Sequence, residues 1–305
     1  MTRWVENLLG WVERRGIMTD SEFGELVAGL RGKLHRYCAR MTGNVIDGED
    51  ALQEALVKAV RARAQLDDVA QPERWLFRIA HNAALDFLRR QTRAQARQSP
   101  EDPETMVDPD DEQPDPELLS TSLRTFMRLP TVQRSSVILM DVLGYSLSEI
   151  GAIMDASLPA VKSALHRGRT RLHELAKEPA DAPPAALSAT ERTLLAAYID
   201  RFNARDYGAV RAMLAEEVHL DLVNRRQLIG KADVQNYFTN YAIASPRRFA
   251  LGLVDGHPAV LVSLSEAPQL VAYFILLTWH DAAVLRIRDF LYAPYALDGA
   301  TIITL

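Results

Sequence analysis

The 305-residue sequence has few cysteines, no long apolar runs and, over one stretch, no basic residues. Its single cysteine, Cys38, excludes a disulfide framework and any metal site built from several thiolates, which fits a reducing compartment. The longest apolar stretches, such as 270–279, are too short to cross a bilayer, and the first residues lack a signal-peptide pattern. We therefore expect a cytoplasmic protein without membrane contact, and no pattern indicates a bound metal or cofactor.

The stretch without basic residues is 99–120, which holds nine acidic side chains although the whole chain has a net charge of only −5. The blocks before and after it, 1–98 and 121–177, have net charges of +3 and +4. Frequent proline and repulsion between like charges predict an extended acidic linker there. The expected organisation is an N-terminal extension (1–18), a helical domain (19–95), the acidic linker (96–116), a second helical domain (117–177), a short linker (178–187) and a C-terminal domain (188–305).

The N-terminal extension allows two interpretations. Residues 1–17 form an amphipathic helix through Val5, Leu8, Leu9 and Val12, or they are a frayed extension ahead of an alternative start at Met18. The sequence does not decide between the two.

Residues 146–172 have the pattern of two short helices joined by a tight turn. Ser146 followed three residues later by Glu149 is a capping box, which starts a helix. Ser157 is suited to cap the next helix, where Pro159 is tolerated because its missing N–H would have no helical partner. These signals predict a helix-turn-helix.

The second of these helices is apolar on one side and basic on the other. The expected core stripe is Leu158, Val161, Leu165 and Leu172. The opposite side and its flanks carry Lys162, Ser163, His166, Arg167, Arg169, Thr170 and Arg171. This layout is typical of a helix that enters the DNA major groove, with cations on phosphates and polar side chains at base edges. The alternative is a solvated basic face on an ordinary helical hairpin.

The first helical domain is expected to contain helices over 22–41, over 47–62 and from Pro72 onward. On the second, Asp50, Gln53 and Glu54 share one face, which is explained either by the helix dipole or by a docking face for a basic partner. One surface of the third combines an aromatic, an amide and cations, which suits single-stranded nucleic acid. That surface consists of Trp75, Arg78, Asn82, Asp86 and Arg89, although Trp75 alone would more often be a core residue.

Two long stretches carry a family resemblance. "DGEDALQEALVKA" and "WLFRIAHNAALDFLRR" resemble region 2 of the extracytoplasmic-function (group IV) sigma factors of bacterial RNA polymerase, and "LPTVQRSSVILMDVLGYSLSEIGAIMDASLPAVKSALHRGRTRL" resembles their region 4. By this resemblance, the face around Asp50, Gln53 and Glu54 would bind the clamp helices of the largest polymerase subunit. The surface from Trp75 to Arg89 would recognise the −10 element, and Lys162 to Arg171 the −35 element. His81, Ala164 and Gly168 depart from the family pattern, from which we expect a weaker and more salt-sensitive grip on DNA.

Residues 188–305 predict an α+β domain. Ser188 and Glu191 form another capping box, which opens a helix through "TLLAAYIDRFNAR", and a second helix is expected over 207–216. A strand "VHLDLV", a short "RQLIG" and a helix over 231–243 are expected next. Four stretches rich in β-branched and aromatic residues follow. The pattern resembles the cone-shaped SnoaL-like branch of the nuclear-transport-factor-two-like superfamily. A pocket in such a cone would involve Tyr198, His219, Asp221, Tyr273 and Trp279, with His219 or Asp221 as a general base in an enzyme. The alternative is that these are sheet-face and rim residues without a substrate.

The predicted fold class is therefore multidomain, with two all-α domains followed by an α+β cone. The predicted function is that of a sigma factor that directs bacterial RNA polymerase to promoters, is not an enzyme, and is regulated in cis by its C-terminal domain. The resemblance implies the polymerase core as partner, through its clamp helices and flap region, together with promoter DNA. The C-terminal domain is expected to contact the sigma domains of the same chain, and a separate anti-sigma protein is expected to be absent. The alternative is a DNA-binding fusion protein whose cone is a small-molecule enzyme or ligand sensor.

Overall fold

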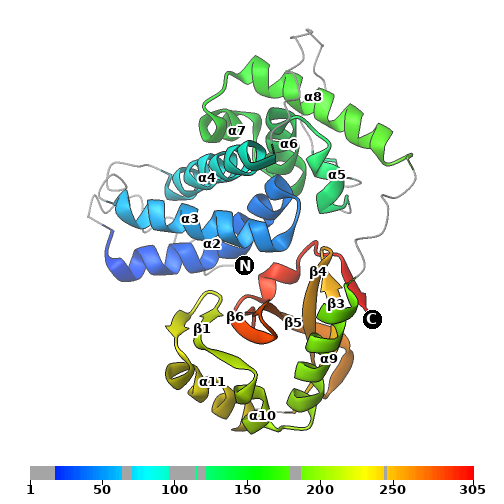
Figure 1. Cartoon of the computed structure of the whole chain (residues 1–305). Helices are drawn as coiled ribbons and strands as arrows, with labels where there is room; N and C mark the ends of the chain where they lie inside the picture. The colour runs from blue at the N-terminus through cyan, green and yellow to red at the C-terminus, as the bar shows by residue number, and fades with distance from the viewer. Residues whose placement is uncertain are drawn as a thin grey trace. The chain divides into compact units, whose positions relative to one another are not determined.

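The computed structural model describes residues 18–63, 71–95, 114–115, 118, 121–178, 187–243 and 246–305. The chain divides into two compact units, Met1–Glu178 (unit 1) and Pro179–Leu305 (unit 2) (Figure 1). Unit 1 is helical and unit 2 combines helices with one sheet, so the predicted fold class is confirmed. None of the described helices combines the length and apolarity needed to span a membrane.

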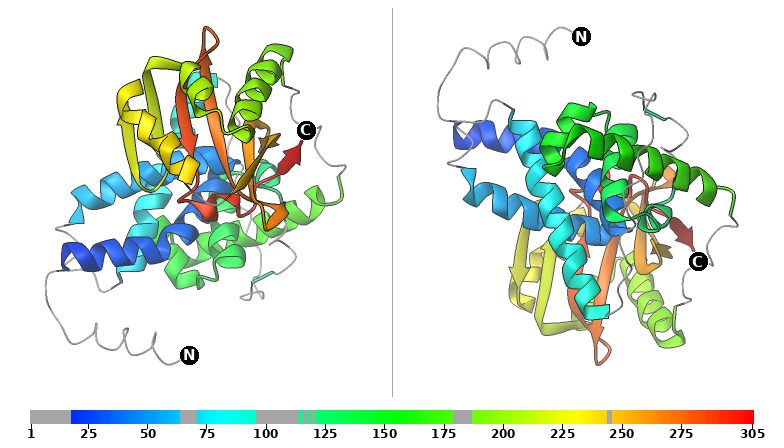
Figure 2. Two further views of the ribbon diagram at one scale, coloured as in Figure 1. Left: turned by 90° about the horizontal axis from the view of Figure 1, so that it is seen from below. Right: turned by 90° about the horizontal axis from the view of Figure 1, so that it is seen from above.

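The described part of unit 1 begins with three helices that pack against one another (Figure 2). They are α2 (Asp20–Thr42), α3 (Val45–Arg61) and α4 (Pro72–Gln95). Gly43 ends α2 in the left-handed conformation, and the Asn44 side chain accepts hydrogen bonds from the first amides of α3. At Gly48 a Cβ atom would lie 2.6 Å from the Cα atom of Ala39, so α2 and α3 approach as closely as glycine permits.

The second part of unit 1 contains the predicted helix-turn-helix. Its elements are α5 (Leu123–Met127), α6 (Thr131–Val137) with a π-helical continuation (Ile138–Val142), α7 (Leu147–Met154) and α8 (Leu158–Leu175). Both predicted caps are confirmed: Ser146 and Glu149 form a capping box, and the Ser157 hydroxyl accepts the Ala160 amide at 3.4 Å. One core residue was predicted wrongly, because Leu158 stands at the exposed first position of α8 and is 47% exposed.

The two helical parts of unit 1 share one core. Buried residues from α2 to α4, such as Phe77, belong to the same cluster as Ile138 and Ile150. Polar contacts join them as well, since the Tyr145 hydroxyl donates to Glu73 at 2.6 Å. The Arg74 guanidinium pairs with Glu149 at 3.3 Å. The three-domain division stays a prediction, because most of the acidic linker lies outside the described residues.

Unit 2 is built on one seven-stranded sheet with the order β2-β1-β6-β5-β4-β3-β7. Its helices are α9 (Ala189–Asn203), α10 (Tyr207–Ala212) and α11 (Lys231–Ile243). Its strands are β1 (Leu214–Leu222), β2 (Arg226–Ile229), β3 (Arg247–Val254), β4 (His257–Leu264), β5 (Ala267–His280), β6 (Ala283–Asp289) and β7 (Ile302–Thr304). β1 and β6 pair in parallel and the other neighbours pair antiparallel. β7 was not predicted, because three residues are too few to show a period.

α9 and α11 close the core of unit 2. Phe202 of α9 and Phe238 of α11 are almost fully buried and have ring centroids 5.9 Å apart. Their cluster also contains Val260, Ile275 and Ile287 from three neighbouring strands. The helices and the inward side of the sheet therefore share one apolar interior.

Candidate functional site

α8 presents a graded surface. His166 and Arg171 are exposed, whereas Lys162, Ser163 and Arg167 are partly buried. Arg171 also pairs with Glu174 at 3.0 Å, one turn further along the same helix. α8 follows α7 after the turn at Asp155, which has the left-handed conformation. The predicted basic side of the helix therefore does face outward, apart from one residue.

That residue is Arg169, which differs from the sequence prediction. Its guanidinium is buried and bonds Asp141 twice, from Nε to Oδ2 at 3.1 Å and from Nη2 to Oδ1 at 2.5 Å. Asp141 lies in the π-helical turn after α6, so the pair ties α8 to that segment. The guanidinium already holds a carboxylate in the interior, so Arg169 holds α8 in place and is left out of the DNA-facing surface.

The structure also gives a reason for the departures at Gly168 and Ala164. A Cβ atom at Gly168 would lie 2.6 Å from the Val137 side chain and 3.1 Å from the Gln133 carbonyl oxygen, so α8 and α6 approach closely at this glycine. Ala164 is buried at 1% exposure. Neither position points toward solvent, which removes the argument that these residues weaken a phosphate contact.

His81 corrects the same expectation on α4. It is 6% exposed, and its Nδ1 atom lies 2.7 Å from the Tyr37 hydroxyl, which in turn is 3.2 Å from the Ser135 hydroxyl of α6. Burial, helped by the charge of Arg89, lowers the pKa of His81 to about 4. His81 is therefore a neutral interior residue at the contact between the two helical parts of unit 1.

The outer surface of α4 agrees with the predicted alignment. Arg78, Asn82 and Arg89 are exposed, and Asp86 is partly exposed. Trp75 is half-buried and packs against the core, so it is partly the core residue that its type alone suggests. The amide and the two guanidinium groups are the side chains of this surface that solvent reaches most freely.

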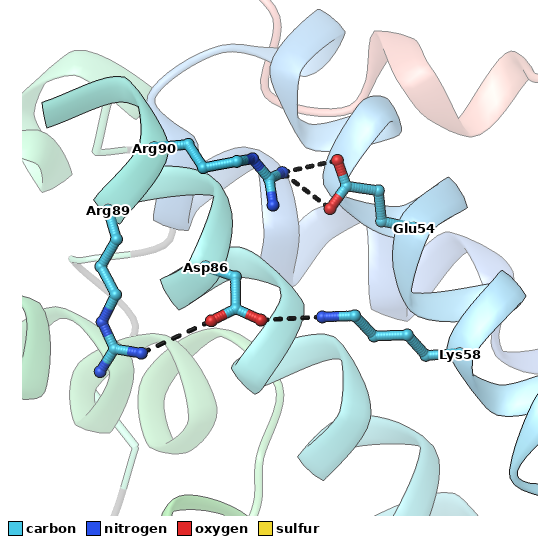
Figure 3. Close-up of polar contacts among 5 residues, drawn as sticks. All are labelled: Glu54, Lys58, Asp86, Arg89 and Arg90. Atoms are coloured by element: carbon cyan, nitrogen blue, oxygen red, sulfur yellow. Dashed lines mark hydrogen bonds and ion pairs between the residues drawn. The ribbon is translucent and has the colours of Figure 1, made fainter. Parts of the chain in front are cut away.

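Ion pairs cross between α3 and α4 (Figure 3). Arg90 donates to both carboxylate oxygens of Glu54, at 2.6 and 2.7 Å, and Lys58 reaches Asp86 at 2.8 Å. The hydrogen bond from Lys58 lowers the pKa of Asp86. Sequence reasoning missed Lys58 and Arg90, although both stand one helical turn from predicted residues. The predicted polymerase face and the predicted −10 surface are thus joined by charge.

The rest of the predicted polymerase face lies on the same helix. Asp50, Gln53 and Glu54 are all partly exposed, and the Gln53 amide donates to Glu49 at 3.2 Å. Glu49 itself is fully buried and pairs with Arg31 at 2.6 Å. The carboxylates of Asp50 and Glu54 therefore both lie on an accessible surface of α3, and that of Glu54 is paired with Arg90.

Unit 2 contains a buried carboxylate surrounded by tyrosines. Asp289 Oδ2 accepts hydrogen bonds from Tyr241 at 2.7 Å and from Tyr237 at 3.0 Å, and Oδ1 accepts the Leu291 amide at 2.8 Å. Burial raises the pKa of Asp289 to about 6, against the lowering effect of these hydrogen bonds. Tyr273 lies 3.0 Å from the Tyr241 hydroxyl. We call Asp289, Tyr237, Tyr241 and Tyr273 the Asp289 cluster.

Unit 2 gathers only part of the predicted pocket. Tyr198 is fully buried beside Trp279, with ring centroids 6.4 Å apart, and Tyr273 belongs to the Asp289 cluster. His219 is exposed on β1, and Asp221 is buried with its Oδ2 atom 3.5 Å from Arg288 Nε. His219 and Asp221 alternate with the core residues of β1, so they point away from the tyrosines.

Sequence reasoning missed the central carboxylate because Asp289 lies at the end of β6, where charged and apolar residues are interspersed and no motif marks it. The described residues contain no group of three or more side chains that would suit a metal ion.

Both helical parts of unit 1 match models of known protein families. Residues 26–94 match the model of sigma-70 region 2, and residues 123–172 match the model of sigma-70 region 4. The chain is 34% identical over 156 residues to the RNA polymerase sigma factor CarQ of Myxococcus xanthus, covering 51% of this chain and 90% of CarQ. It is 35% identical over 167 residues to the ECF RNA polymerase sigma factor SigE of Mycolicibacterium smegmatis, covering 53% of this chain and 65% of SigE.

Solved structures include one neighbour that extends over both units. The extracytoplasmic function sigma factor SigJ of Mycobacterium tuberculosis is 20% identical with a TM-score of 0.35, covering 91% of this chain and 99% of SigJ. An NTF2-like protein of unknown function from Pseudomonas putida KT2440 is 14% identical with a TM-score of 0.27, covering 32% of this chain and 81% of that protein. The nuclear-transport-factor-two-like character of the C-terminal domain stays a prediction.

Proposed function

Since the chain belongs to the extracytoplasmic-function sigma factors of RNA polymerase, we propose that it binds the polymerase core and directs it to promoters, with α8 at the −35 element and α4 at the −10 element. The observation that carries the proposal is the outward basic side of α8, placed by two capped helix starts at the end of a helix-turn-helix. The partners are then the polymerase core and promoter DNA, and the place of action is the cytoplasm.

At the −35 element, the proposed contacts divide by chemistry. Lys162, Arg167 and Arg171 supply cations for phosphates, which fix the helix in its register. Ser163 and His166 supply hydrogen-bonding groups for base edges. Arg169 supports this surface from behind through Asp141.

At the −10 element, the proposed surface is the exposed side of α4. Arg78 and Arg89 would hold the backbone, Asn82 and Asp86 would contact bases, and the exposed edge of Trp75 would stack. Asp50, Gln53 and Glu54 of α3 would bind the clamp helices, while the flap region would contact the second helical part.

The direct test measures promoter binding at several salt concentrations, together with run-off transcription, using purified polymerase core. Lys162→Ala should weaken promoter binding at all sequences and reduce the slope of log affinity against log salt by about one. Lys177→Ala is the matched control, because it removes the same charge from an exposed position beyond the end of α8. Equal effects of the two variants would remove α8 from the DNA interface.

The proposal requires the two helical parts of unit 1 to separate. Two elements named −10 and −35 lie about 25 base pairs apart, or about 85 Å at 3.4 Å per base pair. A folded unit of this length has a radius of gyration of about 15 Å, so the packed form cannot reach both elements. The 21 residues of the acidic linker, 96–116, can extend to about 70 Å. The contacts at Tyr145 and Arg74 would therefore break at the promoter.

A reversible lock tests this separation. Arg74→Cys combined with Glu149→Cys places one thiol on α4 and one on α7, on the two sides of an ion pair that now joins these helices. A bifunctional thiol reagent with a reducible spacer can bridge the two thiols. Burial raises the pKa of Cys38, so the native thiol should not compete. The cross-linked form should lose transcription and recover it when a reductant cleaves the spacer. Undiminished transcription by the cross-linked form would contradict the separation.

Unit 2 is proposed to regulate this activity in cis, by favouring one arrangement of the sigma regions, without a separate anti-sigma protein. The support is a separately folded unit of more than one hundred residues beyond the sigma regions. Deletion of 188–305 should change polymerase binding or transcription. Unchanged values for both would remove the regulatory role and leave promoter recognition intact.

A second candidate for unit 2 is a small-molecule enzyme or ligand sensor. It rests on the Asp289 cluster and on the Tyr198 hydroxyl, a buried oxygen for which the described structure provides no hydrogen-bond partner. Turnover or ligand binding that Asp289→Asn abolishes and Asp221→Asn leaves intact would favour this function over a purely structural cluster.

A further inference from the structure

The last two turns of α3 carry an apolar surface. Val57 is 50% exposed and Val60 is 61% exposed. Together with Leu56 and Arg61 they line one shallow hollow, which we call the α3 patch. Val57 and Val60 line the same hollow, so they form one continuous apolar surface that a short segment is large enough to cover.

The described chain begins next to this patch. Met18 is 6% exposed, and its carbonyl oxygen accepts a hydrogen bond from Arg63 Nη2 at 2.5 Å, two residues beyond the end of α3. Arg63 also pairs with Asp20, and its guanidinium lies 5.7 Å from the centre of the Phe23 ring. The start of α2 is therefore fixed to the end of α3, and residue 17 joins the chain there. Residues 1–17 themselves lie outside the described residues.

The sequence of this extension matches the patch. Placed on a helix at 100° per residue, its large apolar residues fall within an arc of about 160°. These residues are Trp4, Val5, Leu8, Leu9, Trp11 and Val12. Glu6 and Glu13 lie together at one edge of that arc, and the patch carries Arg61 with Lys58 beside it. The apolar face of this segment thus matches the valines of the patch, and its carboxylates match the cations of α3.

The lengths also agree. A helix over residues 4–12 is about 14 Å long, and the part of α3 from Leu56 to Arg61 rises about 8 Å. Residues 13–17 can span up to about 17 Å, which allows the helix to fold back from Met18. Nine residues with a glycine at position 10 form only a marginal helix in water, so this helix needs a surface to form on.

From these observations we propose that residues 4–12 cover the α3 patch as an amphipathic helix in the free protein, with Glu6 and Glu13 toward Lys58 and Arg61. The patch continues the helix surface that holds Asp50, Gln53 and Glu54. As a consequence that rests on the proposed function, the docked segment lies beside the polymerase face and is displaced when the polymerase core binds.

Disulfide trapping in the free full-length chain tests the contact. Leu9→Cys with Val60→Cys should form a disulfide about tenfold faster than Leu9→Cys with Val132→Cys, because docking raises the effective concentration of the two thiols. Val132 of α6 is a matched control with 53% exposure. Equal rates for the two pairs would overturn the proposal.

A second measurement identifies the occupant. With Val60→Cys as a probe, a thiol reagent should react about tenfold faster after Leu8→Asp, which places a charge in the apolar arc. Asn7→Asp adds the same charge outside the apolar arc and should leave the rate unchanged. Slow reaction with both variants means that another segment, such as residues 64–70, covers the patch. Fast reaction of the Val60→Cys probe in a chain without a change in residues 1–17 means that nothing covers the patch. Either result overturns the proposal.

Polymerase binding separates this inference from the proposed function. The oxidised Leu9→Cys/Val60→Cys pair should bind polymerase core at least tenfold more weakly than its reduced form if the segment must leave. Equal binding by both forms would remove the displacement and keep the contact. A chain that traps the disulfide but never binds the core would instead contradict the proposed function.

Discussion

Two buried carboxylates, one in each unit, are stabilised in opposite ways. Asp141 in unit 1 is 4% exposed, and both of its oxygens accept hydrogen bonds from the Arg169 guanidinium. Asp289 in unit 2 is fully buried, and its hydrogen bonds come from two tyrosine hydroxyls and one amide. The first carboxylate has a cation in direct contact, whereas the second is bonded only by neutral donors.

The difference decides how each site responds to change. A paired buried charge depends on its partner, so loss of one member leaves an uncompensated ion in the interior. Neutral donors cannot offset the full cost of burying an anion, which is why the pKa of Asp289 rises to about 6. We expect unit 1 to be sensitive to substitution at Arg169 and unit 2 to be sensitive to pH.

The largest expected effect is that of Arg169→Ala. Removing the cation should lower the free energy of unfolding of unit 1 by about 3–5 kcal/mol, because Asp141 is left buried without its partner. Urea denaturation of the full chain measures the loss. The double variant Arg169→Met with Asp141→Leu should recover most of it. If Arg169→Ala costs less than about 1 kcal/mol, the pair does not hold α8 in place.

The second-largest expected effect is the dependence of the stability of unit 2 on pH. The pKa of Asp289 is about 6 in the folded chain against 3.8 for a free carboxyl, so the folded state retains the proton more strongly. Stability from this group is full below pH 4 and is lost as the pH rises through 6. The loss amounts to about 3 kcal/mol.

Asp289→Asn provides the control for that slope. Denaturation can be followed through Trp279, with the other tryptophans replaced by phenylalanine. The variant should remove the decline in stability between pH 4 and pH 7, since an amide does not titrate there. An unchanged decline would assign the pH dependence to other groups.

A smaller effect is expected where α8 crosses α6. Gly168→Ala should cost about 1–2 kcal/mol, because the contacts of 2.6 and 3.1 Å outweigh the gain of about 1 kcal/mol in helix propensity. Gly29→Ala in α2 is the matched control, since a Cβ atom there meets nothing within 4 Å. That control should be neutral or stabilising. A stabilised Gly168→Ala variant would show that the Val137 side chain moves aside at little cost in free energy.

The smallest effect is expected at the ion pairs between α3 and α4. Glu54 and Arg90 are 40% and 51% exposed, so solvent screens them. A double-mutant cycle with Glu54→Gln and Arg90→Gln should give a coupling of about 0.5 kcal/mol or less. A coupling above about 2 kcal/mol would place this pair with the buried one at Arg169.

Much of the local structure followed from short-range signals. The capping boxes at Ser146 and Ser188 start helices as predicted, and the helix predicted over 231–243 has those bounds. Cap and period depend on neighbours within about four residues, which a sequence displays directly. The outward residues of α4 and α8 followed from the same periodicity, with Arg169 as the exception.

Long-range partners could not be read in this way. Arg169 and Asp141 are 28 residues apart, and Tyr241 and Asp289 are 48 apart. A periodic pattern identifies the side of a helix or strand but not which distant side chain meets it. The same reason explains why the predicted pocket contained Asp221 and not Asp289, and why Gly168 was expected to weaken the grip on DNA.

The sequence by itself determined the helix-turn-helix, the acidic stretch between two basic blocks and the order of helices and strands in unit 2 as far as β6, because caps, charge and periodicity act between near neighbours. Only the tertiary structure decided that Arg169 is an interior residue, that His81 is neutral, and that Asp289 carries the shifted pKa. Burial and pairing depend on segments that are far apart in the chain and meet only when it folds.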